Sequence, residues 1–297
     1  MRPEDVIEQL WPGRAFAIKP LAGITNHNFK VLLEAPDEAV VVRIAGKDTN
    51  LLGIDRAVES AAARMASSIE VGPEVVAFVD PPGWLVTRFI EGVQVPPERM
   101  REPRNLGRVA RALRAIHSAD PIPGRFDAHR VVETYAETAS SRGVEPPPDY
   151  AWAKSISDQI ETTRGPQPPI PCHNDLLNAN FIDDGERIRI IDWEYAGMGD
   201  RFFDLANFSV NHELTEDDDR QLLTAYFGEA TDRDLASLRL MRFMSDFREA
   251  MWGVLQQAIS TLDFDFVTYA TDHFTRLRTT ASAPQFDNWL RAASPVK

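Results

Sequence analysis

Two oxygen-bearing side chains, Asn180 and Asp192, stand at equal distances from Glu186, beside the hairpin signal Asp183-Asp184-Gly185. Residues that pair across a hairpin have a constant sum of residue numbers, so this symmetry predicts that Asn180 and Asp192 face each other, about 5 Å apart. An amide oxygen and a carboxylate at that spacing suit a hard cation. In phosphoryl-transfer sites Mg²⁺ combines one or two protein carboxylates with nucleotide phosphates, so the pattern predicts a phosphate-bound magnesium site.

Asp175 is the candidate for acid–base chemistry because it precedes Asn180 by five residues. It lies on the loop that leads into the first strand of the hairpin. From that loop we expect its carboxylate to face the metal-bound phosphate and to accept a proton from a substrate hydroxyl.

The elements that must position these side chains divide the chain into a front part rich in strands and a long helical back part. Hydrophobic periodicity and turn residues predict a short N-terminal helix, three strands, a helix and two strands in the front part. After the first helix, the expected ranges are strands over 15–19, 29–34 and 39–44, a helix over 55–68, and strands over 75–79 and 84–89. In the back part we expect helices over 105–117, 130–142, 149–163, 200–212, 216–227, 232–260 and 264–280, interrupted by the hairpin runs 181–182 and 188–191.

Composition excludes several classes of protein. The chain has 297 residues, of which 43% are apolar and 26% charged, as in ordinary globular proteins of two domains or lobes. Its net charge of −13 argues against nucleic acid and anionic membranes as partners, since both attract basic faces. The single cysteine excludes an internal disulfide. No apolar run approaches the length of a membrane span, and the acidic N-terminus is unlike a secretory signal. We therefore expect a cytoplasmic protein without membrane insertion.

The segment with the candidate residues resembles a known family. HNDLLNAN at residues 173–180, followed by IDWEY at 191–195, is similar to the catalytic and metal loops of the protein-kinase-like small-molecule kinases. Within that group, which includes the aminoglycoside phosphotransferases, the choline/ethanolamine kinases are most similar, also at 201–207 and 252–270. The resemblance is sharp over about residues 170–270 and looser over 15–90.

The resemblance implies a fold and a reaction. The implied fold class is α+β, protein-kinase-like and two-lobed, with a small antiparallel-sheet N-lobe over residues 1–90 and a larger, mainly helical C-lobe over 91–297. The implied reaction is the transfer of a phosphoryl group from ATP, with Mg²⁺, to the hydroxyl of a small amino alcohol, choline or ethanolamine. The partner is then a small molecule.

The resemblance also assigns roles within the catalytic and metal loops. Asp175 is implied to be the catalytic base, Asn180 and Asp192 to hold Mg²⁺, and Glu194 to reach a second Mg²⁺. We expect His173 to have a structural role in this loop. Asp204 and Asn207 share one helix face, and two roles stay open for them: bracing the catalytic loop or lining the substrate pocket.

Residues 23–28 resemble the turn that covers the nucleotide phosphates. Thr25, Asn26 and Asn28 offer backbone N–H groups and short polar side chains there. The resemblance therefore implies that this turn binds the cofactor.

Arg43 ends the third strand. Protein kinases have a lysine at the corresponding position, whereas choline kinases have an arginine there, as this chain does. An arginine stays charged when partly buried and can grip phosphate oxygens in a fork. Glu59, on the following helix, is its expected ion-pair partner. Phe89 and Ile90 resemble the hinge between the lobes, whose backbone would bind adenine.

The acceptor pocket is expected to contain Asp175, the aromatic residues Tyr195 and Trp252, and Glu249 as a counter-charge for an ammonium group. Many choline kinases carry a second aromatic residue three positions before the tryptophan that matches Trp252, where this chain has Glu249. An acid at that position suits ethanolamine as well as choline.

Two other functions compete with this interpretation. One is a phosphotransferase for aminoglycosides or another bulky small molecule, which would need a wide acidic cleft. The other is a nucleotide-binding module without catalysis, although all the polar groups that catalysis needs are present. A protein kinase is disfavoured because few residues separate Asp192 from the next helix signals, which leaves little room for a peptide-docking segment.

Overall fold

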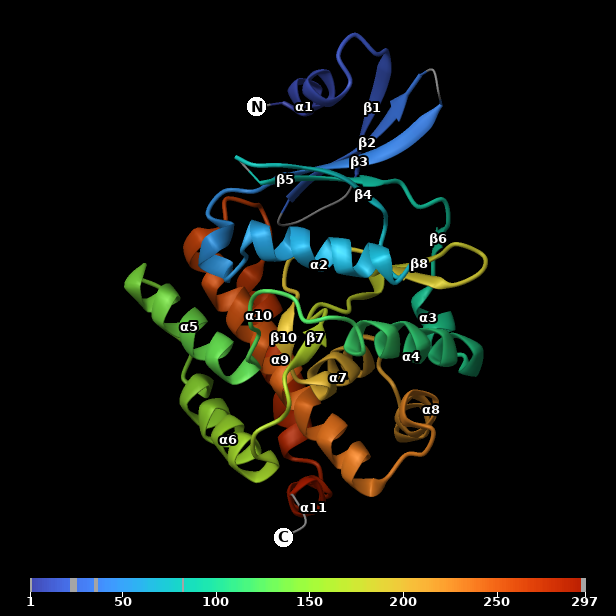
Figure 1. Cartoon of the computed structure of the whole chain (residues 1–297). Helices are drawn as coiled ribbons and strands as arrows, with labels where there is room; N and C mark the ends of the chain where they lie inside the picture. Colours follow the sequence, from blue (N-terminus) through green and yellow to red (C-terminus); the bar gives the residue numbers. More distant parts are fainter. Residues whose placement is uncertain (1, 22–25, 35–36, 82, 295–297) are drawn as a thin grey trace.

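The structure is a computed structural model that describes residues 2–21, 26–34, 37–81 and 83–294. A β-sheet forms one end of the molecule and the rest is mainly helical, with the last helix, α11 (Phe286–Ala293), at the far end (Figure 1). The mixed α+β architecture agrees with the class expected from the sequence. None of the helices within these ranges is both long enough and apolar enough to cross a membrane.

The sheet is antiparallel, with the strand order β1-β2-β3-β5-β4. Alternate residues of β3, such as Val40 and Val42, are buried, and they pack with Val6 and Ile7 of the N-terminal helix in a small separate core. The elements here are α1 (Pro3–Leu10), β1 (Phe16–Leu21), β2 (Asn26–Leu33), β3 (Glu38–Ala45), β4 (Val75–Val79) and β5 (Trp84–Arg88). All five expected strands are confirmed.

Strand β2 begins earlier than expected. The polar segment that ends at residue 28 was predicted as a turn, but Asn26 and Asn28 lie within β2, opposite Ala45 and Arg43 of β3. Thr25 lies outside the described residues. The expected turn was too long because polar side chains are tolerated in a strand where they find partners, as Asn26 does in the site described below.

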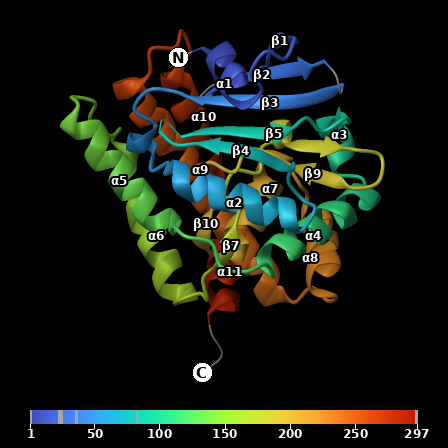
Figure 2. The same cartoon turned by 45° about the horizontal axis from the view of Figure 1, so that its top comes forward.

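Helix α2 (Arg56–Ser68) lies between the sheet and the helical part (Figures 1 and 2). It follows a short 3-10 helix, η1 (Thr49–Leu52), and begins where the side chain of Asp55 accepts hydrogen bonds from the N–H groups of Ala57 and Val58. This cap fixes the start of α2 and therefore the place of Glu59 in its first turn.

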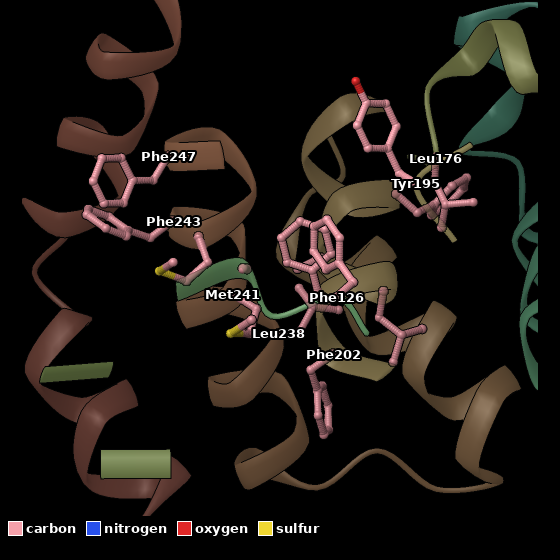
Figure 3. Close-up of a cluster of buried hydrophobic side chains, with 14 of the residues drawn as sticks. Phe126, Leu176, Tyr195, Phe202, Leu238, Met241, Phe243 and Phe247 are labelled. Carbon is pink, nitrogen blue, oxygen red and sulfur yellow. The ribbon is translucent and has the colours of Figure 1, made fainter. Parts of the chain in front are cut away.

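The helical part is built around α9 (Asp232–Ile259), whose residues from Leu235 to Gln256 are buried on almost every side. Figure 3 shows part of this core, in which Met241 and Phe243 of α9 belong to the same cluster as Phe126. The other helices are α3 (Pro97–Met100), α4 (Pro103–His117), α5 (Ala128–Ser141), α6 (Asp149–Arg164), α7 (Arg201–Asn211), α8 (Glu216–Phe227), α10 (Phe266–Ala281) and α11 (Phe286–Ala293). Every long helix was expected from the sequence, whereas the short α3 and α11 were not.

Short strands complete the part that carries the catalytic loop. Strand β7 (Ile170–Cys172) precedes the loop and pairs with β10 (Gly197–Gly199), and neither was expected. The loop ends in a 3-10 turn, η2 (Asn178–Asn180), which leads into the hairpin of β8 (Phe181–Asp183) and β9 (Ile188–Ile190). Strand β6 (Val93–Gln94) adds to β8 as a third strand.

The hairpin exists, but its predicted register was wrong by one residue. Phe181 pairs with Ile190, and the N–H of Ile191 donates to the carbonyl oxygen of Asn180 at 3.0 Å. Asn180 therefore stands opposite Ile191 and not opposite Asp192. The reason is a four-residue loop, in which the Asp184 carboxylate accepts hydrogen bonds from the N–H groups of Glu186 and Arg187.

The hairpin is tied to α4 by an ion pair that makes stability depend on pH. Both guanidinium ends of Arg108 donate to the Asp183 carboxylate at 2.6 Å, which lowers the pKa of Asp183 to about 2. A lowered pKa stabilises the folded state above the unfolded pKa of about 4, and this stability is lost as the pH falls towards 2. We expect Asp183→Asn to lower the free energy of unfolding by about 1–2 kcal/mol at pH 7 and by less at pH 3. Urea denaturation at both pH values measures this difference, and an equal effect at both would contradict it.

Candidate active site

The loop that carries Asp175 is held by a fully buried carboxylate on α7. Asp204 accepts hydrogen bonds from the N–H groups of His173 at 2.8 Å and Asn174 at 2.7 Å, and its Oδ2 also lies 3.0 Å from Nε2 of His117. The side chain of Asn207, one turn later, accepts from the N–H of Leu176. The two α7 residues therefore brace the catalytic loop, which is one of the two roles that the sequence left open.

His173 is buried and acts within the loop, as expected. Its Nδ1 accepts a hydrogen bond from the N–H of Asp175 at 3.2 Å, and its Nε2 lies 3.0 Å from the carbonyl oxygen of Ile191. Burial lowers the pKa of His173, which favours the neutral ring with a proton on Nε2. The ring thus links the catalytic loop to the segment that carries Asp192.

Asn180, at the end of this loop, is bonded to the backbone of Asp175 within it. Nδ2 of Asn180 donates to the backbone carbonyl oxygen of Asp175 at 2.8 Å. Because its nitrogen is used in this way, the amide presents Oδ1 as the atom that can bind a cation.

Asp192 directly follows the residue paired with Asn180 and has a positive φ of 71°. Aspartate tolerates this left-handed backbone better than most residues. Its carboxylate accepts from Arg43, whose guanidinium also pairs with Glu59. The expected pair of Arg43 and Glu59 is therefore present, and it reaches across from β3 to the metal loop.

Glu194 is held by two residues from the sheet end of the molecule. Nδ2 of Asn26 donates to its Oε2 at 2.7 Å, and Arg56 lies 3.4 Å from the same oxygen. Arg56 also donates to Oδ1 of Asn26 and to the carboxylate of Glu59. Sequence reasoning missed Arg56; its place in the first turn of α2, one turn before Glu59, was the available signal.

Two carboxyl groups in the site have raised pKa values. Burial raises the pKa of Asp175 to about 8, against the opposing charge of Arg248. Burial and the neighbouring charge of Asp192 raise the pKa of Glu194 to about 7. Both pKa values therefore lie near neutral pH, the range in which a group can accept and release a proton during catalysis.

Tyr195, Trp252 and Glu249, which were expected to bind the acceptor substrate, each already have a partner within the protein. Nε1 of Trp252 donates to the hydroxyl of Tyr195 at 3.0 Å. The carboxylate of Glu249 pairs with Arg248 through Oε1 and accepts from the Tyr269 hydroxyl through Oε2 at 2.8 Å. A cavity of about 850 Å³ opens beside Tyr195 and Glu194, between the start of α2 and α5.

Phe89 and Ile90 follow β5 in the connection to the helical part. The N–H of Phe89 donates to the carbonyl oxygen of Ala39 at 2.9 Å, and the ammonium group of Lys30 lies 3.3 Å from the centre of the Phe89 ring. At Gly92, a Cβ atom would come within 2.6 Å of the carbonyl oxygen of Asp183. Glycine therefore allows this connection to pass close to the hairpin.

The donor set fits Mg²⁺ at one place. Oδ1 of Asn180 and the carboxylate of Asp192 are hard oxygen donors. The side chain of Asp192 is 27% exposed to solvent, so a cation can reach it. This matches a cation that takes one or two carboxylates and completes its shell with phosphates. A second group, His117, Cys172 and Asp204, lies together within the described residues, but both ring nitrogens of His117 already face Tyr226 and Asp204. Those hydrogen bonds leave that group without a free imidazole ligand.

Several known proteins of one family are similar to this chain. The sequence model of the choline/ethanolamine kinase family matches residues 18–221. Human ethanolamine kinase 2 is 29% identical over 287 residues, which cover 85% of this chain and 72% of the human protein. The crystal structure of a choline/ethanolamine kinase family protein from Mesorhizobium loti is 32% identical, with a TM-score of 0.81 over 93% of this chain and 92% of that one.

An aminoglycoside 2'-phosphotransferase shares the fold at 13% identity, with a TM-score of 0.68 over 94% of this chain and 97% of that one. The expected protein-kinase-like fold and the expected family resemblance are thereby confirmed. So is the expectation that the chain is an enzyme, a small-molecule kinase.

Proposed function

Because this chain belongs to the choline/ethanolamine kinase family, we propose that it transfers the terminal phosphoryl group of ATP, with Mg²⁺, to the hydroxyl of a small amino alcohol, ethanolamine or choline. The observation that carries this proposal is the arrangement of the catalytic loop. Asn180 is tethered to the Asp175 carbonyl, and Asp192 directly follows the residue that pairs with Asn180. These backbone links bring the three residues near one another, which supports their proposed roles as proton acceptor and metal ligands.

In the proposed reaction, Asp175 orients the acceptor hydroxyl and takes its proton as the oxygen attacks the phosphorus atom. Asn180 and Asp192 would hold Mg²⁺, and Glu194 a second ion. The bound metal neutralises the charge of the transferring phosphoryl group. Arg43 supports the site by fixing the Asp192 carboxylate, and its own position is fixed by Glu59.

We place the nucleotide between the two proposed lobes, residues 1–90 and 91–297. Asn26 and Asn28 would lie over the phosphates, and the backbone of Phe89 and Ile90 would face adenine. The support for this placement is the link that Asn26 makes to Glu194, because it joins the start of β2 to the metal loop.

The surroundings of Tyr195 favour ethanolamine over choline as the acceptor. A trimethylammonium group donates no hydrogen bond and depends on free aromatic faces, but the guanidinium of Arg248 already lies 4.5 Å from the Tyr195 ring centre. Both oxygens of Glu249 are engaged as well. A primary ammonium can instead donate hydrogen bonds to carboxylate, hydroxyl or carbonyl oxygens and needs no free aromatic face.

A panel of acceptors tests the proposal through coupled ADP release. We expect turnover with ethanolamine, and kcat/KM that falls with each added methyl group, by about tenfold or more from ethanolamine to choline. Kanamycin belongs in the same panel because an aminoglycoside phosphotransferase shares this fold. Absence of turnover with every amino alcohol would refute the proposal, and turnover with kanamycin alone would favour the aminoglycoside alternative.

A further inference from the structure

Arg248 of α9 contacts the loop that carries Asp175. Its side chain is 2% exposed, and it is among the largest fully buried side chains within the described residues. A buried guanidinium is costly unless charged and polar partners surround it. The identity of its partners therefore indicates its role.

On one side, Arg248 holds the peptide group that leads into Asp175. Its Nη2 donates to the carbonyl oxygen of Asn174 at 3.1 Å and lies 3.5 Å from Oδ1 of Asp175. The N–H of the same peptide group, which belongs to Asp175, donates to Nδ1 of His173. The peptide plane before Asp175 is thus held at both its oxygen and its nitrogen.

On the other side, Arg248 is itself held in place. Its Nη1 pairs with Oε1 of Glu249, and the hydroxyl of Tyr269 in α10 donates to Oε2 of Glu249 at 2.8 Å. The contacts form one chain from Tyr269 through Glu249 and Arg248 to Asp175. Only a guanidinium can reach Glu249 with one nitrogen and the loop with another, because a lysine has a single point of charge.

We propose that Arg248 is a positioning residue, through which Glu249 and Tyr269 set the orientation of the Asp175 carboxylate for phosphoryl transfer. The proposal rests on the proposed function insofar as Asp175 is the base. In this proposal Glu249 holds Arg248 in place and does not contact the acceptor substrate directly. A base displaced by about 1 Å loses much of its effect on turnover. Substrate binding that depends on other residues is unchanged.

The kinetic test compares Arg248→Lys with Arg242→Lys. Arg242 lies in the same helix but bonds to Leu214 and Asp219, away from the loop. We expect Arg248→Lys to lower kcat by about tenfold or more, with KM for the amino alcohol and the Kd for ATP changed by less than about threefold. Arg242→Lys should keep kcat within about twofold. The concentration of folded Arg248→Lys is measured by titration of its ATP-binding sites, and kcat is calculated per site. An unchanged kcat in this variant would overturn the proposal.

A second measurement does not depend on turnover. Hydrogen exchange of the Asp175 amide should be faster in Arg248→Lys than in the wild type and unchanged in Arg242→Lys. Equal protection in all three proteins would overturn the proposal, even if the wild type phosphorylated no amino alcohol and the proposed function itself had failed. If Arg248→Lys does not fold, Tyr269→Phe takes its place in both measurements, because it removes only the hydroxyl that holds Glu249. Unchanged kcat and unchanged exchange in Tyr269→Phe would then contradict the proposal.

Discussion

Replacing Asp175 by Asn should lower kcat by about 100-fold or more, because the amide has nearly the same size but cannot take the proton of the acceptor hydroxyl. The Asp175 side chain is 11% exposed, so it is reachable from solvent while its surroundings hold it in one orientation. Burial raises the pKa of Asp175 to about 8, so its carboxylate binds a proton more tightly than an exposed aspartate does. Steady-state ADP release with ethanolamine measures the loss.

The control for this variant is its ability to bind nucleotide. No contact assigned to ATP involves the Asp175 side chain, so the Kd for ATP should stay within about threefold of the wild-type value. Turnover within about tenfold of the wild type, in a protein that binds ATP normally, would exclude Asp175 as the base.

Replacing Asp192 by Asn should have an effect of similar size through the metal. Asparagine also tolerates the left-handed backbone at this position, so the fold of the segment should be kept. The variant loses the negative charge that faces the cation and pairs with Arg43. We expect kcat to fall by about 100-fold, and the Mg²⁺ concentration for half-maximal activity to rise by about tenfold or more.

A Mg²⁺ titration of ADP release separates this effect from general damage to the hairpin. Asp183→Asn is the matched control, because Asp183 lies on the same hairpin but pairs with Arg108 of α4. Its half-maximal Mg²⁺ concentration should equal that of the wild type. An unchanged Mg²⁺ dependence in Asp192→Asn would remove Asp192 from the metal site.

Local signals were enough to predict the elements whose ends are determined by nearby residues. Helix α8 has its predicted bounds because Thr215 and Asp218 cap it reciprocally within one turn. Strand β4 also has its predicted bounds. Strands β7 and β10 were missed because each has only three residues, too few for a periodic pattern.

The hairpin register and the buried arginines could not be predicted in the same way. Asp184 closes a four-residue loop with its own side chain, so the pairing differs by one residue from the predicted pairing centred on Glu186. Arg56 and Arg248 bond to residues that lie 138 and 74 positions away along the chain. The neighbouring sequence places Arg56 beside Glu59, but it does not specify partners so far away along the chain, and the folded chain shows them.

The central claim is that Asn180 and Asp192 share one divalent ion beneath the nucleotide, with Asp175 beside it. A crystal structure with Mn²⁺ and a non-hydrolysable ATP analogue tests it most directly, because anomalous scattering locates the metal. We predict an anomalous peak at about 2–2.5 Å from both Oδ1 of Asn180 and a carboxylate oxygen of Asp192, in contact with phosphate oxygens. A phosphate-bound peak that contacts neither residue would contradict the claim.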